Sequence, residues 1–237
     1  MKTYDTISAL QDSENQRIQV IAKHIKNGVL FADMSAHIDS DVEIGEGTSI
    51  LPGVILLQGT KIGRGCTVGP NTVICNGKIG DNVTVNSAQI YDSSVGSSTT
   101  VGPFAHIRNN CDVGERCRIG NFVELKNSII KSDCKMSHLT YIGDAEMGKN
   151  VNMGCGTITV NYDGVVKHKT IIGDNAFVGC NSNLIAPVTV GCDTLIAAGT
   201  TVHEDVPDGA LAISRPRQTT IQDAAGKIFQ KKKAQKK

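Results

Sequence analysis

Residues 38–62 read IDSDVEIGEGTSILPGVILLQGTKI and place an aliphatic side chain at every sixth position. A six-residue period fits neither the 3.6-residue period of an amphipathic helix nor the alternation of a half-buried strand. It is typical of a solenoid in which each repeat forms one flat face of a prism. The stretch therefore predicts a parallel β-helix built from hexapeptide repeats.

The same rhythm continues to Val202, with occasional steps of five residues. Each anchor is expected to point into a narrow prism, and stacking the coils buries a continuous aliphatic column that no coil could bury alone. Glycine follows many anchors, which gives the backbone the freedom that a sharp corner needs. The predicted core consists of Ile38, Ile44, Ile50, Leu56, Ile62, Val68, Ile74, Ile79, Val85, Ile90, Val95, Val101, Ile107, Val113, Ile119, Leu125, Ile130, Met136, Ile142, Met147, Met153, Ile172, Val178, Leu184, Val190, Ile196 and Val202.

The N-terminal segment, residues 1–35, carries a different signal. Three isoleucines recur at helical spacing in residues 13–27, SENQRIQVIAKHIKN. Ser13 is placed to cap a helix and Gly28 to end it. We expect one short linker helix that leads into a β-helix spanning residues 36–206.

Two later segments break the hexapeptide rhythm. Residues 161–170, NYDGVVKHKT, are polar, charged and too long for a corner. We expect them to form a loop that projects from the prism, and such loops on rigid scaffolds often carry function. Residues 207–237 lack periodicity, so we expect an irregular C-terminal arm that ends in the solvated basic tail KKKAQKK. The predicted fold is thus all-β, with helix only near the N-terminus.

The composition narrows the function classes. The chain has 237 residues, no tryptophan and a formal net charge of +1. It is long enough for one elongated domain with a sizeable core, but its charge gives no global attraction to nucleic acid or an anionic membrane. No apolar segment approaches the roughly 18 residues of a membrane span, and the N-terminus lacks the apolar region of a secretory signal. We expect a cytoplasmic protein without nucleic-acid or membrane partners.

Eight cysteines raise the question of a metal site or of disulfides. They contain no C-x-x-C pair, and several recur at multiples of the repeat. That spacing is typical of small residues at the corners of a solenoid, so we expect reduced structural thiols and no metal. The cysteines are Cys66, Cys75, Cys111, Cys117, Cys134, Cys155, Cys180 and Cys192.

Residues 121–169 are the richest in charged and hydrogen-bonding side chains. His138 stands two residues after the anchor Met136 in this segment, with Thr140 and Tyr141 close by. A lone histidine is more often structural than catalytic, so its position alone does not identify a base. The motifs around it are needed to interpret it.

These motifs are GNFVELKN, MSHLTYIGDAEMGKNVNMGCGTITVNYDG, KTIIGDNAFVGCNS, APVTVG, IAAGTTV and ALAISR. Together they resemble the acetyltransferase half of the bacterial bifunctional UDP-N-acetylglucosamine pyrophosphorylase/glucosamine-1-phosphate N-acetyltransferases. The resemblance runs in order from Asn15 to about Arg215 and is more specific than a generic hexapeptide repeat. It implies a left-handed parallel β-helix that forms a homotrimer. It also implies acetyl transfer from acetyl-CoA to glucosamine-1-phosphate, toward UDP-N-acetylglucosamine and cell-wall precursors.

The resemblance further implies a role for each matching residue. His138 matches a general base that takes a proton from the sugar amine, with Glu124 orienting the imidazole and Asn161 beside the reacting thioester. A base is needed because an ammonium group is not a nucleophile, and an imidazole ordinarily titrates near neutral pH. The residues that match phosphate ligands of the substrate are Arg108, Lys126 and Lys167. Tyr141 and Asn152 match positions that bind its sugar. The implied coenzyme A contacts are Cys155, Asn161, Tyr162, Cys180, Ala198 and Arg215.

The chain departs from the family pattern in several places. Asn109 and Asn110 stand where the family usually has Pro-Gly. In the coenzyme A groove, Cys180 replaces a common serine and Cys155 replaces an alanine. The Gly-rich nucleotide loop of the pyrophosphorylase half has no counterpart, so we expect no uridylyltransferase activity. The starting methionine and the unmatched lead before Asn15 favour a stand-alone protein over an excised domain.

Three alternatives stay open at this point. A zinc-dependent γ-type carbonic anhydrase needs three converging histidines, two of them closely spaced, whereas the histidines here are widely scattered. A non-catalytic β-helix would serve only for oligomerisation or regulation, yet the complete polar set disfavours it. An acetyltransferase for a different amino-sugar acceptor would keep that set, so the acceptor itself stays undecided.

Overall fold

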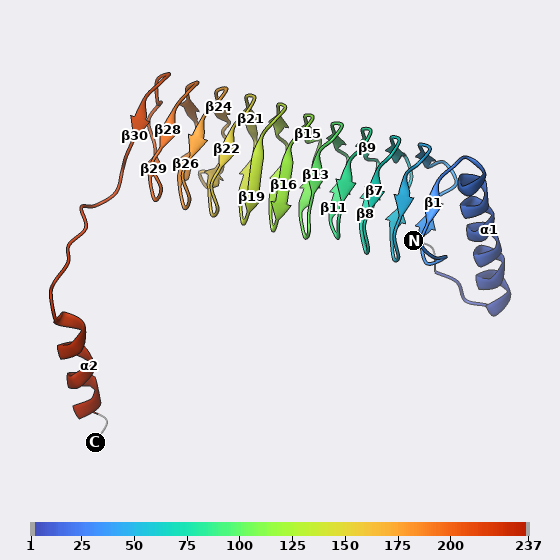
Figure 1. Cartoon of the computed structure of the whole chain (residues 1–237), viewed down its shortest axis with the longest axis horizontal. Helices are drawn as coiled ribbons and strands as arrows, with labels where there is room; N and C mark the ends of the chain where they lie inside the picture. Colours follow the sequence, from blue (N-terminus) through green and yellow to red (C-terminus); the bar gives the residue numbers. More distant parts are fainter. Residues whose placement is uncertain (1–2, 236–237) are drawn as a thin grey trace.

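The computed structural model describes residues 3–235 as a long solenoid with one helix beside each end (Figure 1). Helix α1 spans Ile7–Lys26, and helix α2 spans Ala224–Ala234. Each short strand between them pairs in parallel with the strand one coil away. The fold is a left-handed parallel β-helix. Within the described residues, neither helix has the length and apolar character needed to cross a bilayer.

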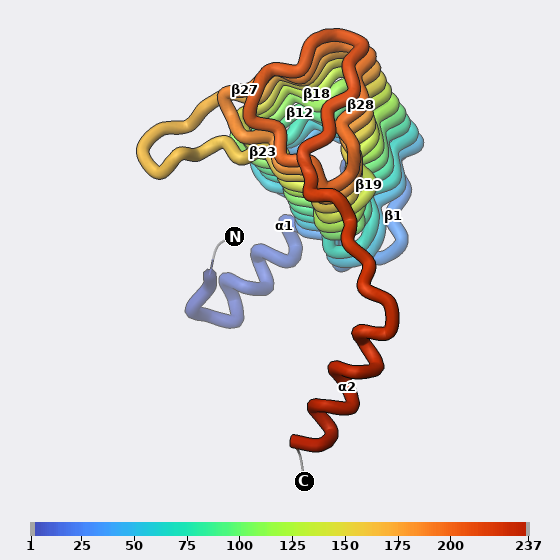
Figure 2. The backbone as a smooth tube through the Cα atoms, turned by 90° about the vertical axis from the view of Figure 1, so that its left-hand side faces the viewer, coloured from blue at the N-terminus to red at the C-terminus, as the bar shows by residue number. Residues whose placement is uncertain are grey.

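The strands form three parallel sheets, which are the faces of the prism seen end-on in Figure 2. Sheet A contains β1 (Leu30–Phe31), β4 (Ser49–Ile50), β7 (Thr67–Val68), β10 (Thr84–Val85), β13 (Thr100–Val101), β16 (Arg118–Asn121), β19 (Lys135–His138), β22 (Asn152–Met153), β25 (Phe177–Val178), β28 (Leu195–Ile196) and β30 (Leu211–Ala212). Sheet B contains β2 (His37–Ile38), β5 (Ile55–Leu56), β8 (Val73–Cys75), β11 (Gln89–Tyr91), β14 (His106–Arg108), β17 (Glu124–Lys126), β20 (Tyr141–Gly143), β23 (Ile158–Val160), β26 (Asn183–Ile185) and β29 (Thr201–Val202). Sheet C contains β3 (Glu43–Ile44), β6 (Lys61–Ile62), β9 (Lys78–Ile79), β12 (Ser94–Val95), β15 (Asp112–Val113), β18 (Ile129–Ile130), β21 (Ala145–Met147), β24 (Thr170–Ile172) and β27 (Val188–Val190).

The predicted anchors fill the inside of the prism. All of them belong to the buried core except Ile44, which is half-buried. A typical two-residue strand such as β6 exposes its first side chain, Lys61, and buries its second, Ile62. Burying an aliphatic side chain contributes about 1.5–3 kcal/mol, so a column shared by all coils stabilises the whole solenoid at once.

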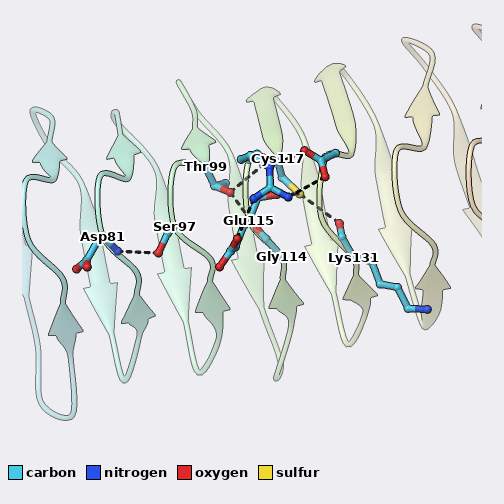
Figure 3. Close-up of polar contacts among 9 residues, drawn as sticks. Asp81, Ser97, Thr99, Gly114, Glu115, Cys117 and Lys131 are labelled. Atoms are coloured by element: carbon cyan, nitrogen blue, oxygen red, sulfur yellow. Dashed lines mark hydrogen bonds and ion pairs between the residues drawn. The ribbon is translucent and has the colours of Figure 1, made fainter.

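Several polar groups at the corners form hydrogen bonds between neighbouring coils (Figure 3). Thr99 Oγ1 accepts the Cys117 N–H at 3.0 Å and donates to the Gly114 carbonyl at 2.9 Å. The Cys117 thiol donates to the Lys131 carbonyl at 3.3 Å. Buried polar groups need such partners, so these ladders allow threonine and cysteine to occupy inward positions. All eight cysteines lie within the described residues, and all are free thiols.

Neighbouring coils approach so closely that some corners admit only glycine. A Cβ on Gly120 would lie 1.9 Å from the Ser137 carbonyl oxygen, and one on Gly154 would lie 2.5 Å from the Cys180 nitrogen. Both clashes involve backbone atoms, which cannot move aside as the end of a flexible side chain can. The spacing of the coils is therefore fixed at these corners.

The N-terminal helix is longer than the segment 13–27 predicted from its isoleucines. It begins earlier because the Thr6 hydroxyl caps it, accepting a first-turn N–H at 3.2 Å. Ser13, the predicted cap, lies inside the helix, where its hydroxyl donates to Tyr4 Oη at 2.7 Å. Gly28 follows the end of the helix with φ of 82°, which suits its predicted role as a stop.

The prediction of a fully irregular C-terminal arm is wrong for α2. The chain is irregular after β30 as far as Asp223, and the next 11 residues are helical. Helix α2 lies apart from the prism in both views, and none of its residues is buried. Its helicity therefore comes from the intrinsic propensity of alanine, lysine and glutamine. Lys236 and Lys237, the end of the predicted basic tail, lie outside the described residues.

Replacing Leu184 with alanine should lower the free energy of unfolding by about 2–5 kcal/mol, because its side chain is fully buried in the column. Leu195→Ala makes the same chemical change at a side chain that is 46% exposed and should cost much less. Urea denaturation followed by circular dichroism measures both variants. Equal losses would contradict the assignment of the anchor column as the core.

Candidate functional site

One column of side chains runs along the corner between sheets A and B. Its members lie one coil apart, because each corner hydrogen-bonds to the previous one: the Asn181 N–H donates to the Cys155 carbonyl, and the Gly199 N–H donates to the Cys180 carbonyl, both at 2.8 Å. The corner column consists of Asn121, His138, Cys155, Cys180 and Ala198. The predicted base and three predicted coenzyme A contacts thus share one edge of the prism.

The His138 imidazole is paired with Asn121. Strands β16 and β19 hold the two residues in register, and the Asn121 amide oxygen lies 2.6 Å from His138 Nδ1. An amide oxygen can only accept, so this contact places the proton on Nδ1 and leaves a lone pair on Nε2. The Thr140 hydroxyl donates to the His138 carbonyl at 2.7 Å and fixes the backbone there. Sequence reasoning missed Asn121, although it lies one coil before His138.

Within this chain the Glu124 carboxylate contacts Arg108 and not the His138 imidazole. The carboxylate accepts from Arg108 Nε at 2.9 Å and from Arg108 Nη2 at 2.5 Å. The reason is the register: Glu124 lies on the face of sheet B, opposite Tyr141, whereas His138 lies at the corner. Arg108 Nη1 also donates to Asn109 Oδ1 at 3.1 Å. Glu124 therefore positions the guanidinium, together with Asn109.

Three predicted phosphate ligands gather as a cation cluster, which consists of Arg108, Lys126 and Lys167. Arg108 and Lys126 are register partners on β14 and β17, and Lys167 reaches them from the loop. The neighbouring Lys167 ammonium lowers the pKa of Lys126, burial lowers it further, and Arg108 acts in the same direction. Cations held this close favour an anionic ligand, since a shared anion offsets their repulsion.

Tyr141 lies beside the cation cluster on the face of sheet B. A Cβ added to Gly143 would lie 2.3 Å from Tyr141 Oη, so the phenol occupies the space that a side chain at Gly143 would fill. Gly143 is the register partner of Lys126. The face of sheet B thus presents a phenol and cations close to the corner that carries His138.

The base of the projecting loop is fixed by Asp144. Its carboxylate accepts from Asn127 Nδ2 at 2.5 Å and also from Asn161 Nδ2. Asn161 is buried, and its carbonyl accepts the His168 N–H at 2.8 Å. The Asn161 side chain and its backbone carbonyl therefore both anchor the loop.

The projecting loop has its own internal order (Figure 2). Asp163 Oδ1 accepts the backbone N–H groups of Val165 and Val166, both at 2.8 Å, and Asp163 Oδ2 pairs with His168 Nε2 at 2.7 Å. These bonds lower the pKa of Asp163 to about 2, and the bond from His168 has the largest effect. Tyr162 is exposed, with its hydroxyl donating to the Gly164 carbonyl at 2.7 Å.

Two predicted site residues lie away from the sheet B face. Asn152 lies on sheet A, between Lys135 and Phe177 in register, so it belongs to a different face of the prism from Tyr141. Arg215 follows β30, and its Nη1 donates to the Ala198 carbonyl at 2.6 Å. Arg215 thus lies at the end of the corner column opposite His138.

Metal-ligating residues are scattered through the described part of the chain. In residues 3–235, no three histidine, cysteine, aspartate or glutamate side chains gather in a group that could hold a metal ion.

Comparison with known proteins agrees with the fold. The family model "Bacterial transferase hexapeptide (six repeats)" matches residues 41–76 and 92–127. Among solved structures, the UDP-N-acetylglucosamine acyltransferase from Campylobacter jejuni is similar with a TM-score of 0.51 and 19% sequence identity, over 84% of this chain and 82% of that chain. The chain is therefore a β-helix protein built from hexapeptide repeats.

Several curated relatives have a much higher sequence identity to this chain than that solved structure has. The "Bifunctional protein GlmU" of Caldanaerobacter subterraneus subsp. tengcongensis is 56% identical over 86% of this chain and 45% of that protein. The "Bifunctional protein GlmU" of Brevibacillus brevis is 46% identical over 98% of this chain and 50% of that protein. The chain spans about half the length of these curated relatives, and it is a homologue of one half of the GlmU proteins.

The Asp163 carboxylate should keep the loop ordered until the solution becomes strongly acidic. Its pKa in the folded loop, about 2, lies below the ordinary value of about 4, so its stabilising effect is complete above pH ~4 and is lost as the pH falls toward 2. Asp163→Ala should speed amide exchange at Val165 and Val166 above pH ~4, and its difference from the wild type should shrink as the pH falls toward 2. Asp163→Asn keeps the acceptor for these amides but loses the charge, so it should remove the pH dependence. A loop whose exchange is equal in all three proteins would contradict this assignment.

Proposed function

We propose that the chain is a glucosamine-1-phosphate N-acetyltransferase that takes its acetyl group from acetyl-CoA. The observation that carries the proposal is the position of the His138–Asn121 pair at the corner next to the face that holds the cation cluster. The homology to one half of the GlmU proteins supports it. Only the acetyl-transfer half of a bifunctional activity is proposed for this chain.

In the proposed reaction, His138 is the general base. The sugar amine attacks the thioester carbonyl, and its nitrogen becomes cationic as the C–N bond forms. Nε2 of His138 takes the proton, because Asn121 holds the tautomer that leaves this lone pair free. The C–S bond then breaks, and the imidazolium returns the proton to the leaving coenzyme A thiolate. Positioned proton transfer of this kind contributes about 10²–10⁴ to the rate.

The sugar phosphate is proposed to bind in the cation cluster. A phosphate dianion there would meet Arg108, Lys126 and Lys167, and Tyr141 would lie between this group and the base. Glu124 and Asn109 orient the guanidinium, which favours a bidentate contact with phosphate oxygens. The sugar is thereby held with its phosphate on sheet B and its amine toward the corner.

Acetyl-CoA is proposed to lie along the corner column. Cys155, Cys180 and Ala198 would line its pantetheine arm, and Arg215 at the far end would meet its phosphates. The backbone at Asn161 and Tyr162 would face the thioester, where a positioned N–H stabilises a developing oxyanion by about 3 kcal/mol. Asn152, which lies on sheet A, would join the site only when subunits pack together in an assembly.

The proposed assembly is a homotrimer, as the family resemblance implies. An apolar strip beside the corner column supports subunit contact there: Phe104 and Phe122 stack with ring centroids 5.4 Å apart, and Leu139 continues the row. All three are exposed and have positive φ angles of 59°, 55° and 46°. Bulky residues rarely adopt this conformation, and an exposed apolar row is a common interaction surface.

Replacing His138 with alanine should slow acetyl transfer by about 10²–10⁴ without changing assembly, because the base is lost while the coil remains. The assay follows the free thiol released from acetyl-CoA with glucosamine-1-phosphate as acceptor. His37→Ala is the matched control, since His37 is exposed on β2, in the first coil of the solenoid. Full activity in His138→Ala would exclude the base role. Absence of acceptor-dependent release from the folded wild type would favour another amino sugar or a non-catalytic β-helix.

Replacing Lys126 with alanine should raise KM for glucosamine-1-phosphate by about 10- to 100-fold, because a charge-assisted hydrogen bond to the phosphate contributes about 1.5–3 kcal/mol. Slow turnover of unphosphorylated glucosamine should be nearly unaffected, so the preference for the phosphorylated sugar shrinks. Lys78→Ala, on sheet C, serves as the control. Equal losses with both sugars would contradict a phosphate contact at Lys126.

A further inference from the structure

Two thiols stand next to each other in the corner column. The register of β22 with β25 pairs Met153 with Val178, and the Asn181 N–H donates to the Cys155 carbonyl at 2.8 Å. This register makes Cys155 and Cys180 direct neighbours on successive coils. Cys180 is exposed and Cys155 is half-buried, so solvent can reach the pair.

A second thiol pair in the same chain is also in register but is buried. Cys117 and Cys134 precede the register partners Arg118 and Lys135, and both side chains are buried. The Cys134 thiol donates to the Gly148 carbonyl at 3.0 Å, and the neighbouring Cys117 together with burial raises the pKa of Cys134. The chain therefore contains an accessible pair and an inaccessible pair with the same backbone relation.

The backbone relation suits a disulfide. Neighbouring strands lie about 4.7–4.9 Å apart, and disulfides join Cα atoms about 4.4–6.8 Å apart. Both pairs join residues on successive coils, and exposure is what separates them. Attack on an oxidant in solution requires an accessible thiolate.

We propose that Cys155 and Cys180 form an oxidation site that closes to a reversible disulfide in the presence of a peroxide. The consequence for catalysis rests on the proposed function, because the bridge would form midway along the column that we assign to acetyl-CoA. It would draw both sulfurs together across the proposed pantetheine path, between His138 and Ala198. Acetyl-CoA binding is then lost until a thiol reductant reopens the bond.

The chemistry balances with hydrogen peroxide as the oxidant. The Cys180 thiolate attacks one peroxide oxygen, the O–O bond breaks, and the departing hydroxide takes a proton to become water. The Cys155 thiolate then attacks the resulting sulfenic acid, the S–O bond breaks, and a second water leaves as the S–S bond forms. Two thiols are oxidised, and one peroxide is reduced to two waters.

The test treats the full chain with hydrogen peroxide, blocks the remaining thiols by alkylation and maps tryptic peptides by mass spectrometry. Cleavage after Lys167 and Lys169 separates the two thiols into different peptides. The expected result is a linked pair that persists in Cys192→Ser, disappears in Cys180→Ser and is reversed by dithiothreitol. Peptides carrying Cys117 and Cys134 should stay unlinked and provide the internal control.

For each protein, the rate of acetyl transfer after peroxide treatment is divided by the rate before treatment, and this quotient is the activity ratio. The wild type should lose most of its acetyl transfer and recover it with dithiothreitol, whereas Cys180→Ser should keep its own starting activity. Oxidation of Cys180 without a link to Cys155 would overturn the proposed bond. A Cys155–Cys180 bond that leaves the activity ratio unchanged would overturn the inference that the bridge prevents acetyl-CoA binding. If the proposed function itself is wrong, the untreated protein will show no acetyl transfer before any peroxide is added, so the two failures can be told apart.

Discussion

The in-register stacking of coils is the constraint on which the rest of the molecule depends. Each coil must approach the next until their backbones hydrogen-bond, and at corners such as Gly120 over Ser137 no side-chain atom fits between them. That contact converts sequence spacing into spatial columns, because a residue one coil later always lies directly above its predecessor. The corner column and the sheet B face are two such columns, and neither could form if one coil slipped by a residue.

The core of this fold could be predicted from one sequence because the six-residue period encodes it directly. Steps of five residues, such as Ile74 to Ile79, did not obscure the signal, since the corners absorb them while the anchors stay buried. The ends were harder to predict. Helix α1 starts early because Thr6 caps it and Ser13 reaches Tyr4, whereas α2 forms from local propensity without any buried contact.

Identities of candidate site residues followed from the family resemblance, but their partners did not. Asn121 contacts His138 only because β16 and β19 align them, and Glu124 contacts Arg108 for the corresponding reason on sheet B. A matching motif does not name the side chain that each member contacts one coil away. The separation of Asn152 from Tyr141 illustrates this point, since one chain alone leaves them on different faces of the prism.

The projecting loop links electrostatics to the proposed binding step. Asp144 anchors the loop through Asn161, and the loop then holds the Lys167 ammonium beside Lys126. Two like charges held side by side repel each other, and more strongly near a protein surface than in bulk water. The Lys167 ammonium lowers the pKa of Lys126, and the Asp144 carboxylate acts in the opposite direction. An anion bound among these cations would replace repulsion with attraction, so phosphate binding and closure of the loop would be one electrostatic event. The segment that interrupts the repeat is therefore the part of this rigid scaffold that can respond to a ligand.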